Sequence, residues 1–426
     1  MSRKIRVIAL IAAFALMLSG CSLFTVDEDL VNAQTVASVN GKAITRSQVE
    51  QTLLSSQSFM YEMYYYGVTY EDFKKDDKAK AWYVENLNYT LDRLVEEELL
   101  RLKAAEMGIA LTDEEKAEKR EEADAEFQYA KEQIRSEVEQ EFGLIDENGE
   151  QTGAEADEAA IDAEVEKRYQ EFLGTSDFTP DMYYEQLYNQ ALVAKVTDYV
   201  KGLAEVTDED VRKWYDDTLA VQQPQMDETP TVFADNMNKN LINTYVPEDT
   251  YALKHVLIKY KDEDLTEVAT ELYTGGKEAE AMELLKGEIE ALTPAMLEVK
   301  QRLEAGESID ELIKELGEDP GMASGTTAAT GYIVGESTTT YVKEFKDAAL
   351  KLTSVGQISG PVATYYGLHV LQNIKTYKKG IIPFEDLKDS IKTALLPGRQ
   401  TAKYKDTLEQ WKSEANITYD RARLEN

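Results

Sequence analysis

The sequence predicts an α+β protein that is mostly helical and contains one small sheet domain. Apolar residues recur at helical spacing over two long stretches, 87–102 and 384–411. Two short apolar runs with strand character, 253–259 and 367–371, lie between them. The chain has 426 residues, which is more than one core usually organises, so two or three packed units are expected.

Composition excludes several classes of protein. Charged residues make up 30% of the chain, and the net charge is −35. Polytopic membrane proteins are excluded because each membrane span needs about 20 apolar residues. A surface this acidic repels phosphates, so nucleic acid is not expected as a partner, whereas unfolded cationic chains would be attracted.

Residues 1–20 have the features of a secretory signal. Three basic residues within the first six precede an apolar run, 7–18, that is too short to span a bilayer as a helix. The following Leu18-Ser19-Gly20-Cys21 resembles a bacterial lipobox, which implies that Cys21 is acylated and anchors an extracytoplasmic protein to the cell membrane. The alternative is an ordinary signal peptide with a chance cysteine. Cys21 is the only cysteine, so no internal disulfide is expected.

A helical domain is expected at 35–216, after a polar tether at 21–34. Its first residues predict two strands joined by a tight turn at Asn40-Gly41, then a helix opened by a capping box of Thr45 and Gln48. This opening resembles the N-terminal segment of the SurA and PrsA foldases. The resemblance implies a chaperone domain that binds unfolded or newly secreted polypeptides.

Two segments of this domain allow two interpretations each. Residues 113–172 are rich in Glu, Ala and Lys and are interrupted at 146–150, which predicts an arm of two polar helices. Solvated helices are the favoured interpretation of this arm, and a binding device is the alternative. Residues 59–66 are dense in tyrosine and methionine, which suits the binding of unfolded chains, although core packing is the favoured interpretation.

The second half of the chain is expected to contain a linker, a sheet domain and a final helix. Residues 217–248 are rich in Gln, Pro, Asn and Thr, which indicates a linker. The sheet domain is expected at 249–380 and an amphipathic helix at 381–426, interrupted at Pro397-Gly398. The resemblance to the foldases implies that this helix packs on the N-terminal helices, which makes the sheet domain an insertion.

The chain has two histidines, His255 and His369, and each lies on one of the two strand-like runs. These runs resemble the first and last strands of the parvulin family of peptidyl-prolyl isomerases, whose hallmark is a pair of histidines on adjacent strands. The segments between them match in order: a helix at 309–316 opened by a capping box of Ser308 and Glu311, an acidic segment at 317–320, a helix at 342–350, and a turn and strand at 355–362.

The resemblance implies a role for each matching residue. A polar floor would consist of four residues of the catalytic network, and a proline pocket would consist of four substrate-binding residues. The first set is His255, Asp319, Thr364 and His369, and the second is Thr330, Tyr341, Phe345 and Tyr366.

Several of these positions depart from the family pattern. Thr330 replaces a leucine that lines the pocket, and Tyr366 replaces a smaller residue, so the pocket is expected to be less apolar and narrower. A basic phosphate-binding loop is absent, with only Lys259 and Lys261 among acids, so phosphorylated substrates are not expected.

The expected activity is cis/trans isomerisation of X-Pro bonds, which needs no metal and no small-molecule cofactor. Rotation about a peptide bond has a barrier of about 18–20 kcal/mol, and a pocket that prefers the twisted amide lowers it. The alternatives are a holdase chaperone with an inactive parvulin domain, and a surface adhesin or solute receptor. The histidines could also be core residues or metal ligands, but two widely separated ligands argue against a metal site.

Overall fold

The computed structural model describes residues 33–70, 72–144, 157–175 and 179–425. Contacts divide the chain into two compact units, of which unit 1 comprises residues up to 204 and from 400 onward, and unit 2 comprises 205–399. The predicted signal sequence and Cys21 lie outside the described residues. No helix among the described residues has an apolar stretch of the length needed to cross a bilayer.

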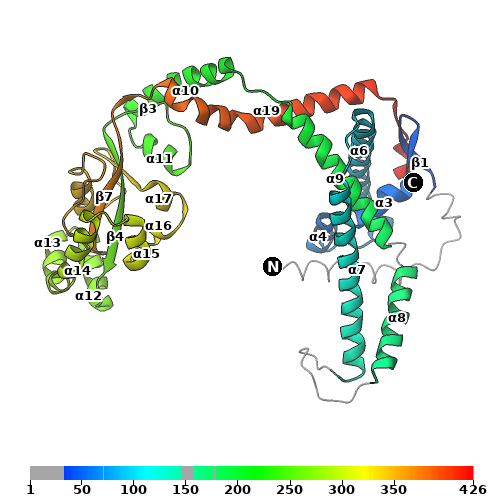
Figure 1. Cartoon of the computed structure of the whole chain (residues 1–426), viewed down its shortest axis with the longest axis horizontal. Helices are drawn as coiled ribbons and strands as arrows, with labels where there is room; N and C mark the ends of the chain where they lie inside the picture. The colour runs from blue at the N-terminus through cyan, green and yellow to red at the C-terminus, as the bar shows by residue number, and fades with distance from the viewer. Residues whose placement is uncertain (1–32, 71, 145–156, 176–178, 426) are drawn as a thin grey trace. The chain divides into compact units, whose positions relative to one another are not determined.

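Unit 1 combines a small antiparallel sheet, of order β2-β1-β9, with long helices (Figure 1). Its hairpin turns at Asn40 and Gly41, whose φ angles of 51° and 87° lie in the left-handed region that these two residue types tolerate. The strands are β1 (Thr35–Val39), β2 (Lys42–Thr45) and β9 (Ile417–Tyr419). The helices are α3 (Arg46–Leu54), α4 (Gln57–Tyr66), α5 (Asp72–Lys75), α6 (Asp77–Met107), α7 (Asp113–Glu141), α8 (Glu158–Thr175), α9 (Pro180–Gly202) and α20 (Ala422–Glu425), with the end of α19 (Phe384–Glu414).

The core of unit 1 forms around α6. Its apolar residues at helical spacing, Leu87, Leu91, Val95 and Leu99, are completely buried. They pack with β1, α9 and Leu408 of α19, so the distal part of α19 lies on the N-terminal helices, as the resemblance implies. The predicted capping box of Thr45 and Gln48 is present at the start of α3.

Helices α7 and α8 run side by side in the acidic segment (Figure 1). Val138, Ile161 and Val165 form a small buried core between them, and Arg168 of α8 donates to Glu141 of α7. The two predicted polar helices are therefore present, held together by a narrow apolar seam and by ion pairs.

The tyrosine-rich helix α4 is not a core helix, contrary to the favoured interpretation. Only Phe59 is buried among its residues, where it stacks on Trp82 with ring centroids 5.0 Å apart. Four tyrosines of α4 are between 66% and 86% exposed: Tyr61, Tyr64, Tyr65 and Tyr66. One helix face is buried, and the tyrosines occupy the others.

Unit 2 contains a four-stranded antiparallel sheet of order β5-β4-β7-β6 and a two-stranded pair, β3 with β8. The strands are β3 (Tyr245–Val246), β4 (Thr250–Lys259), β5 (Tyr332–Gly335), β6 (Val362–Thr364), β7 (Gly367–Tyr377) and β8 (Gly380–Ile381). The helices are α10 (Asp208–Glu228), α11 (Val232–Asn238), α12 (Glu263–Thr274), α13 (Glu278–Leu284), α14 (Lys286–Glu304), α15 (Ile309–Leu316), α16 (Pro320–Ala323), α17 (Gly325–Thr330) and α18 (Lys343–Ala349), with the beginning of α19.

Alternate residues of the central strands face two different cores, as the pleat requires. Val256 and Val370 pack with α14 and α15 on one face. Leu253 and Leu371 pack with Phe345 of α18 on the other face.

The predicted linker at 217–248 is wrong. Most of this segment is helical, since it contains the second half of α10 and all of α11. Met226 and Phe233 are buried in a core with Tyr245 and Ile333. The polar composition misled the prediction because a few buried anchors are enough to fix the segment. The border between the units falls at 204, whereas the helical domain was expected to extend to 216. Helix α10 therefore belongs to unit 2 and not to that domain.

Two local predictions also require correction. Helix α19 continues through Pro397-Gly398, where the chain is exposed to solvent, so water can replace the one backbone bond that proline removes. The Ser308 hydroxyl caps α15 through the amide of Asp310, not through a capping box with Glu311.

The packing of α11 gives a test of the corrected boundary. Phe233→Ala should lower the free energy of unfolding of unit 2 by about 3–5 kcal/mol because it empties a fully buried site. Val221→Ala on α10 is the matched control, since Val221 is 64% exposed and its loss should cost less than about 0.5 kcal/mol. Urea unfolding followed by circular dichroism measures both. Equal stability of the two variants would contradict the packed segment and support the original prediction of a linker.

Candidate active site

The pairing of β4 with β7 brings the two histidines together. In its register His255 lies opposite Leu371, and His369 lies opposite Leu257. Residues directly opposite in an antiparallel pair share a face, so both imidazoles project from the same face as diagonal neighbours. Their Nδ1 atoms are 3.0 Å apart, although the residues are separated by 114 positions.

Four polar side chains form one continuous network. His255 Nε2 lies 3.0 Å from Asp319 Oδ2, and His369 Nε2 lies 2.8 Å from the Thr364 hydroxyl. Both imidazoles and Thr364 are buried, and the Asp319 side chain is 16% exposed. The structure therefore brings together all four residues of the expected polar floor.

With both imidazoles neutral, one order of protons satisfies the contacts between these four side chains. Asp319 has only acceptors, so His255 donates from Nε2 and its Nδ1 becomes an acceptor. His369 then donates from Nδ1, and its Nε2 accepts from the Thr364 hydroxyl. Only one proton fits between the two Nδ1 atoms, so at most one of the two imidazoles can be protonated on both of its nitrogens.

Burial and hydrogen bonding shift the pKa values of His369 and Asp319. The pKa of His369 is lowered to about 3, mainly by burial and to a smaller extent by the adjacent His255, while the Asp319 carboxylate acts in the opposite direction. For Asp319 burial raises the pKa, but hydrogen bonds from His255 and Tyr332 outweigh burial and lower the pKa to about 2. The site thus has a fixed carboxylate and a neutral His369 at neutral pH.

Backbone contacts hold Asp319 beside His255. Strand β5 pairs with β4 only over 250–253, so the amide of Glu318 reaches the open edge and donates to the Leu257 carbonyl at 2.9 Å. Asp319 is also the N-cap of α16.

Tyr332 is a site residue that the sequence analysis missed. Its hydroxyl donates to Asp319 Oδ2 at 2.7 Å, and its ring lies 5.3 Å from that of His255. Gly321 makes room for it, since a Cβ there would lie 2.1 Å from the Tyr332 hydroxyl. The feature of the sequence that could have identified Tyr332 is its position as the aromatic residue directly after Gly331.

Aromatic rings cover the histidines. Phe345 approaches both imidazoles edge-on, with centroids 5.1 and 5.5 Å away, and it is 3% exposed. Tyr341 packs on Phe345 at 5.5 Å and on Tyr332 at 5.1 Å. Both tyrosines are half-buried, so they provide the aromatic surface that solvent reaches above the buried phenylalanine.

Two other expected substrate-binding residues make contacts outside this group of rings. The Thr330 hydroxyl donates to the Thr326 carbonyl within its own helix at 2.8 Å. The Tyr366 ring is 51% exposed and packs on Tyr365 at 4.1 Å, so it does not fill the space beside Phe345. Its backbone amide, however, donates to the Thr364 hydroxyl at 3.1 Å.

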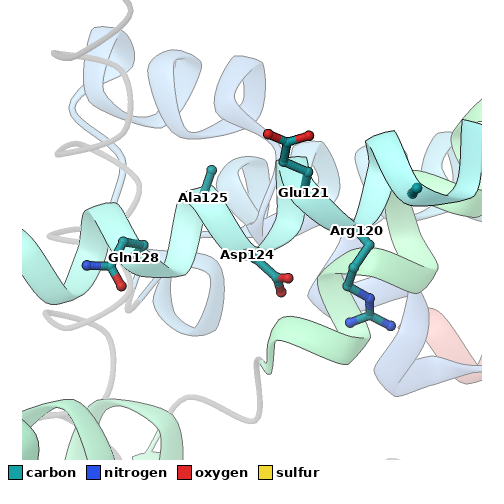
Figure 2. A pocket seen from close by; sticks show the side chains of 6 residues that line it. Arg120, Glu121, Asp124, Ala125 and Gln128 are labelled. Atoms are coloured by element: carbon teal, nitrogen blue, oxygen red, sulfur yellow. The ribbon is translucent and has the colours of Figure 1, made fainter. Parts of the chain in front are cut away.

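Other candidate sites are weaker. A shallow hollow on α7 is lined by side chains of a single helix, among them Arg120, Glu121, Asp124 and Gln128 (Figure 2). Arg120 there already pairs with Asp181 and lies over the Tyr184 ring. The described part of the chain contains no cluster of three metal-ligating side chains.

Comparisons with known proteins match both units. Residues 2–142 match a SurA-like N-terminal domain, and residues 255–375 match a PPIC-type PPIASE domain. Foldase protein PrsA of Clostridium botulinum is 23% identical over 424 residues, covering 99% of this chain and 98% of the relative. Foldase protein PrsA of Clostridium acetobutylicum is 25% identical over 418 residues, covering 98% and 97%.

The chain is of the PrsA/SurA type, with a parvulin domain. The predicted fold class is therefore confirmed, as is the assignment of an isomerase domain. The crystal structure of PrsA from Bacillus subtilis is 16% identical, covers 90% of this chain and 94% of its own, and has a TM-score of 0.23, which supports no further conclusion. The parvulin match begins at His255 and includes all four network residues, although it assigns no role to them.

The proton order of the parvulin network can be measured directly. ¹⁵N NMR of histidine-labelled protein at pH 7 should show protonated Nε2 on His255 and protonated Nδ1 on His369. With only two histidines in the chain, assignment needs one His→Gln variant. Two neutral imidazoles protonated at the same ring position would contradict the order.

The same samples test the pH dependence. The pKa of His369 is lowered by folding, so only the unfolded chain takes up its proton between about pH 6.5 and 3. Stability should therefore fall as pH decreases through this window, by at most about 1.4 kcal/mol per pH unit for this one proton. Titration of the His369 resonance near pH 6 in the folded protein would refute this.

Proposed function

We propose that this chain is an extracytoplasmic foldase that isomerises X-Pro bonds of exported proteins and assists their folding. The observation that supports it best is the network of His255, His369, Asp319 and Thr364 beneath Phe345, within a domain that matches the PPIC type. Both relatives described above are named foldases, which supports the wider role.

The geometry favours isomerisation without proton transfer or covalent chemistry. Rotation about the X-Pro bond removes amide resonance, so the twisted amide is less polar than the planar one. Tyr341, Tyr332 and Phe345 form an aromatic surface. Transfer from water to this surface costs less free energy for the less polar twisted amide than for the planar ground state, so the barrier to rotation is lowered. His369 is neutral and hydrogen-bonded on both nitrogens, so its part is to hold the floor in shape.

The helical unit supplies a surface for clients in this proposal. The four exposed tyrosines of α4 combine apolar rings with polar tips, which suits contact with varied unfolded chains. No small-molecule cofactor is part of the mechanism.

Activity can be tested by NMR exchange spectroscopy on an X-Pro peptide with the full chain. His369→Ala and Phe345→Ala should each lower kcat/KM about tenfold or more, the equivalent of about 1.4 kcal/mol. Tyr332→Phe, which removes only the hydroxyl bound to Asp319, should lower it less. Tyr377→Phe in the same unit is the control and should leave it unchanged. Wild-type exchange equal to that of the free peptide would refute isomerase activity.

A holdase with an inactive parvulin domain is the second candidate. It is favoured by Thr330, whose hydroxyl occupies the position of a pocket leucine, and by the low exposure of Phe345. Suppression of client aggregation by wild type, in the absence of any exchange catalysis, would select this candidate. Aggregation suppression that survives in His369→Ala would assign the chaperone role to other parts of the chain.

Anchoring through a lipid on Cys21 completes the proposal, and Cys21 lies outside the described residues. Cells fed a labelled fatty acid should incorporate the label into wild type and not into Cys21→Ser. The variant should also leave the membrane fraction, because a free N-terminus provides no acyl chains to insert. Equal labelling of both proteins, or none in wild type, would rule out the anchor.

A further inference from the structure

A second group of tyrosines adjoins the histidine network where β6 turns into β7. Tyr365 and Tyr366 occupy the turn between Thr364 and Gly367, with ring centroids 4.1 Å apart. Tyr365 donates to the Tyr366 hydroxyl at 2.7 Å. The ring of Tyr273 on α12 lies 4.6 Å from that of Tyr365. Three rings therefore lie in sequence, and the Tyr366 ring at their end is half exposed.

A carboxylate joins this group. The Tyr273 hydroxyl donates to Glu344 Oε2 at 2.7 Å. This single bond leaves the negative charge of the carboxylate in place. The lysines of α18 nearest to Glu344 are engaged elsewhere: Lys343 pairs with Asp347, and Lys346 donates to the Glu336 carbonyl.

Both ends of the group are attached to residues of the proposed proline site. Glu344 directly precedes Phe345 on α18. At the other end the amide of Tyr366 donates to the Thr364 hydroxyl, which contacts His369. Tyr365 and Tyr273 themselves pack against the core of Val256 and Val370, so the group lies at the edge of the sheet and is joined to the proline site through Glu344 and Thr364.

Acidic side chains lie beside the basic residues around the group. Lys259 lies opposite Gly367 in the β4–β7 pairing, on the same face as His369. Its amide donates to the Glu318 carboxylate, and the amide of Lys261 donates to the Glu288 carboxylate. Each lysine of this corner is thus accompanied by an acid, and Glu344 adds another.

We propose that Tyr366, Tyr365 and Glu344 form a subsite that selects a cationic side chain, arginine above lysine, next to the isomerised proline. A guanidinium stacks flat on an aromatic ring and pairs with a carboxylate through several donors, which a compact ammonium does less well. The inference rests on the proposed function because it takes the ligand to be a proline-containing chain, and it names the substrate class for that site.

The test uses the full chain and fluorescent peptides of equal length that contain Arg-Pro, Lys-Pro, Ala-Pro or Glu-Pro, with a Pro-Arg peptide for the other side of the proline. Anisotropy gives Kd, and NMR exchange gives kcat/KM. Wild type should bind the better of the two arginine peptides about tenfold more tightly than the Glu-Pro peptide, because the arginine gains one cation–π contact and one exposed ion pair.

The variants separate charge from shape. Glu344→Gln keeps an acceptor for Tyr273 and should reduce the arginine advantage about two- to fivefold. Tyr366→Ala should reduce it by a similar factor, whereas Tyr366→Phe keeps the ring and most of the advantage. Glu298→Gln is the matched control, an exposed acid on α14 across the sheet, and should change nothing.

Each outcome decides the question. Equal Kd values for arginine and glutamate peptides overturn the subsite, as does an equal loss in Glu344→Gln and Glu298→Gln, which would indicate general attraction to an acidic chain. A binding preference without exchange catalysis supports the subsite and refutes the isomerase proposal. Catalysis without preference does the reverse.

Discussion

The register of β4 against β7 is the constraint on which the rest of the site depends. It places His255 and His369 diagonally on one face, so their Nδ1 atoms meet. A slip of one residue would turn one imidazole to the opposite face, toward the core of α14 and α15. Val256 and Val370, both fully buried in that core, oppose the slip because it would remove one of them from its packing there. Packing on one side of the sheet thus fixes the chemistry on the other.

Once the register is set, the polar groups satisfy one another around the Asp319 carboxylate. Thr364, two imidazoles and Asp319 form a chain in which each acceptor meets a donor, and Tyr332 supplies one donor more. Buried polar groups are costly unless paired, so the network both stabilises and rigidifies the floor. Rigid polar groups below and aromatic rings above suit a reaction that needs a shaped, weakly polar surface and no nucleophile.

How far the sequence predicted the structure depended on the range of the interaction. Capping boxes such as that at Thr45 were predictable because both partners lie within four residues. The linker at 217–248 was not, because its order comes from Phe233 and Met226 in a core formed by distant strands. Tyr332 was missed for a similar reason, since its role depends on the close approach of Gly321. The resemblance to parvulins supplied the residues of the network but not their contacts.

The sequence by itself determined the helical character of most of the chain, the two strand-like runs with their histidines, and the acidic surface. These follow from periodicity and composition, which are local properties. Only the tertiary structure decided which tyrosines are exposed, that Thr330 bonds within its own helix, and that Tyr365 and Tyr366 connect through Tyr273 to Glu344. Such outcomes depend on which face of each element is covered, and that is fixed by residues far apart along the chain.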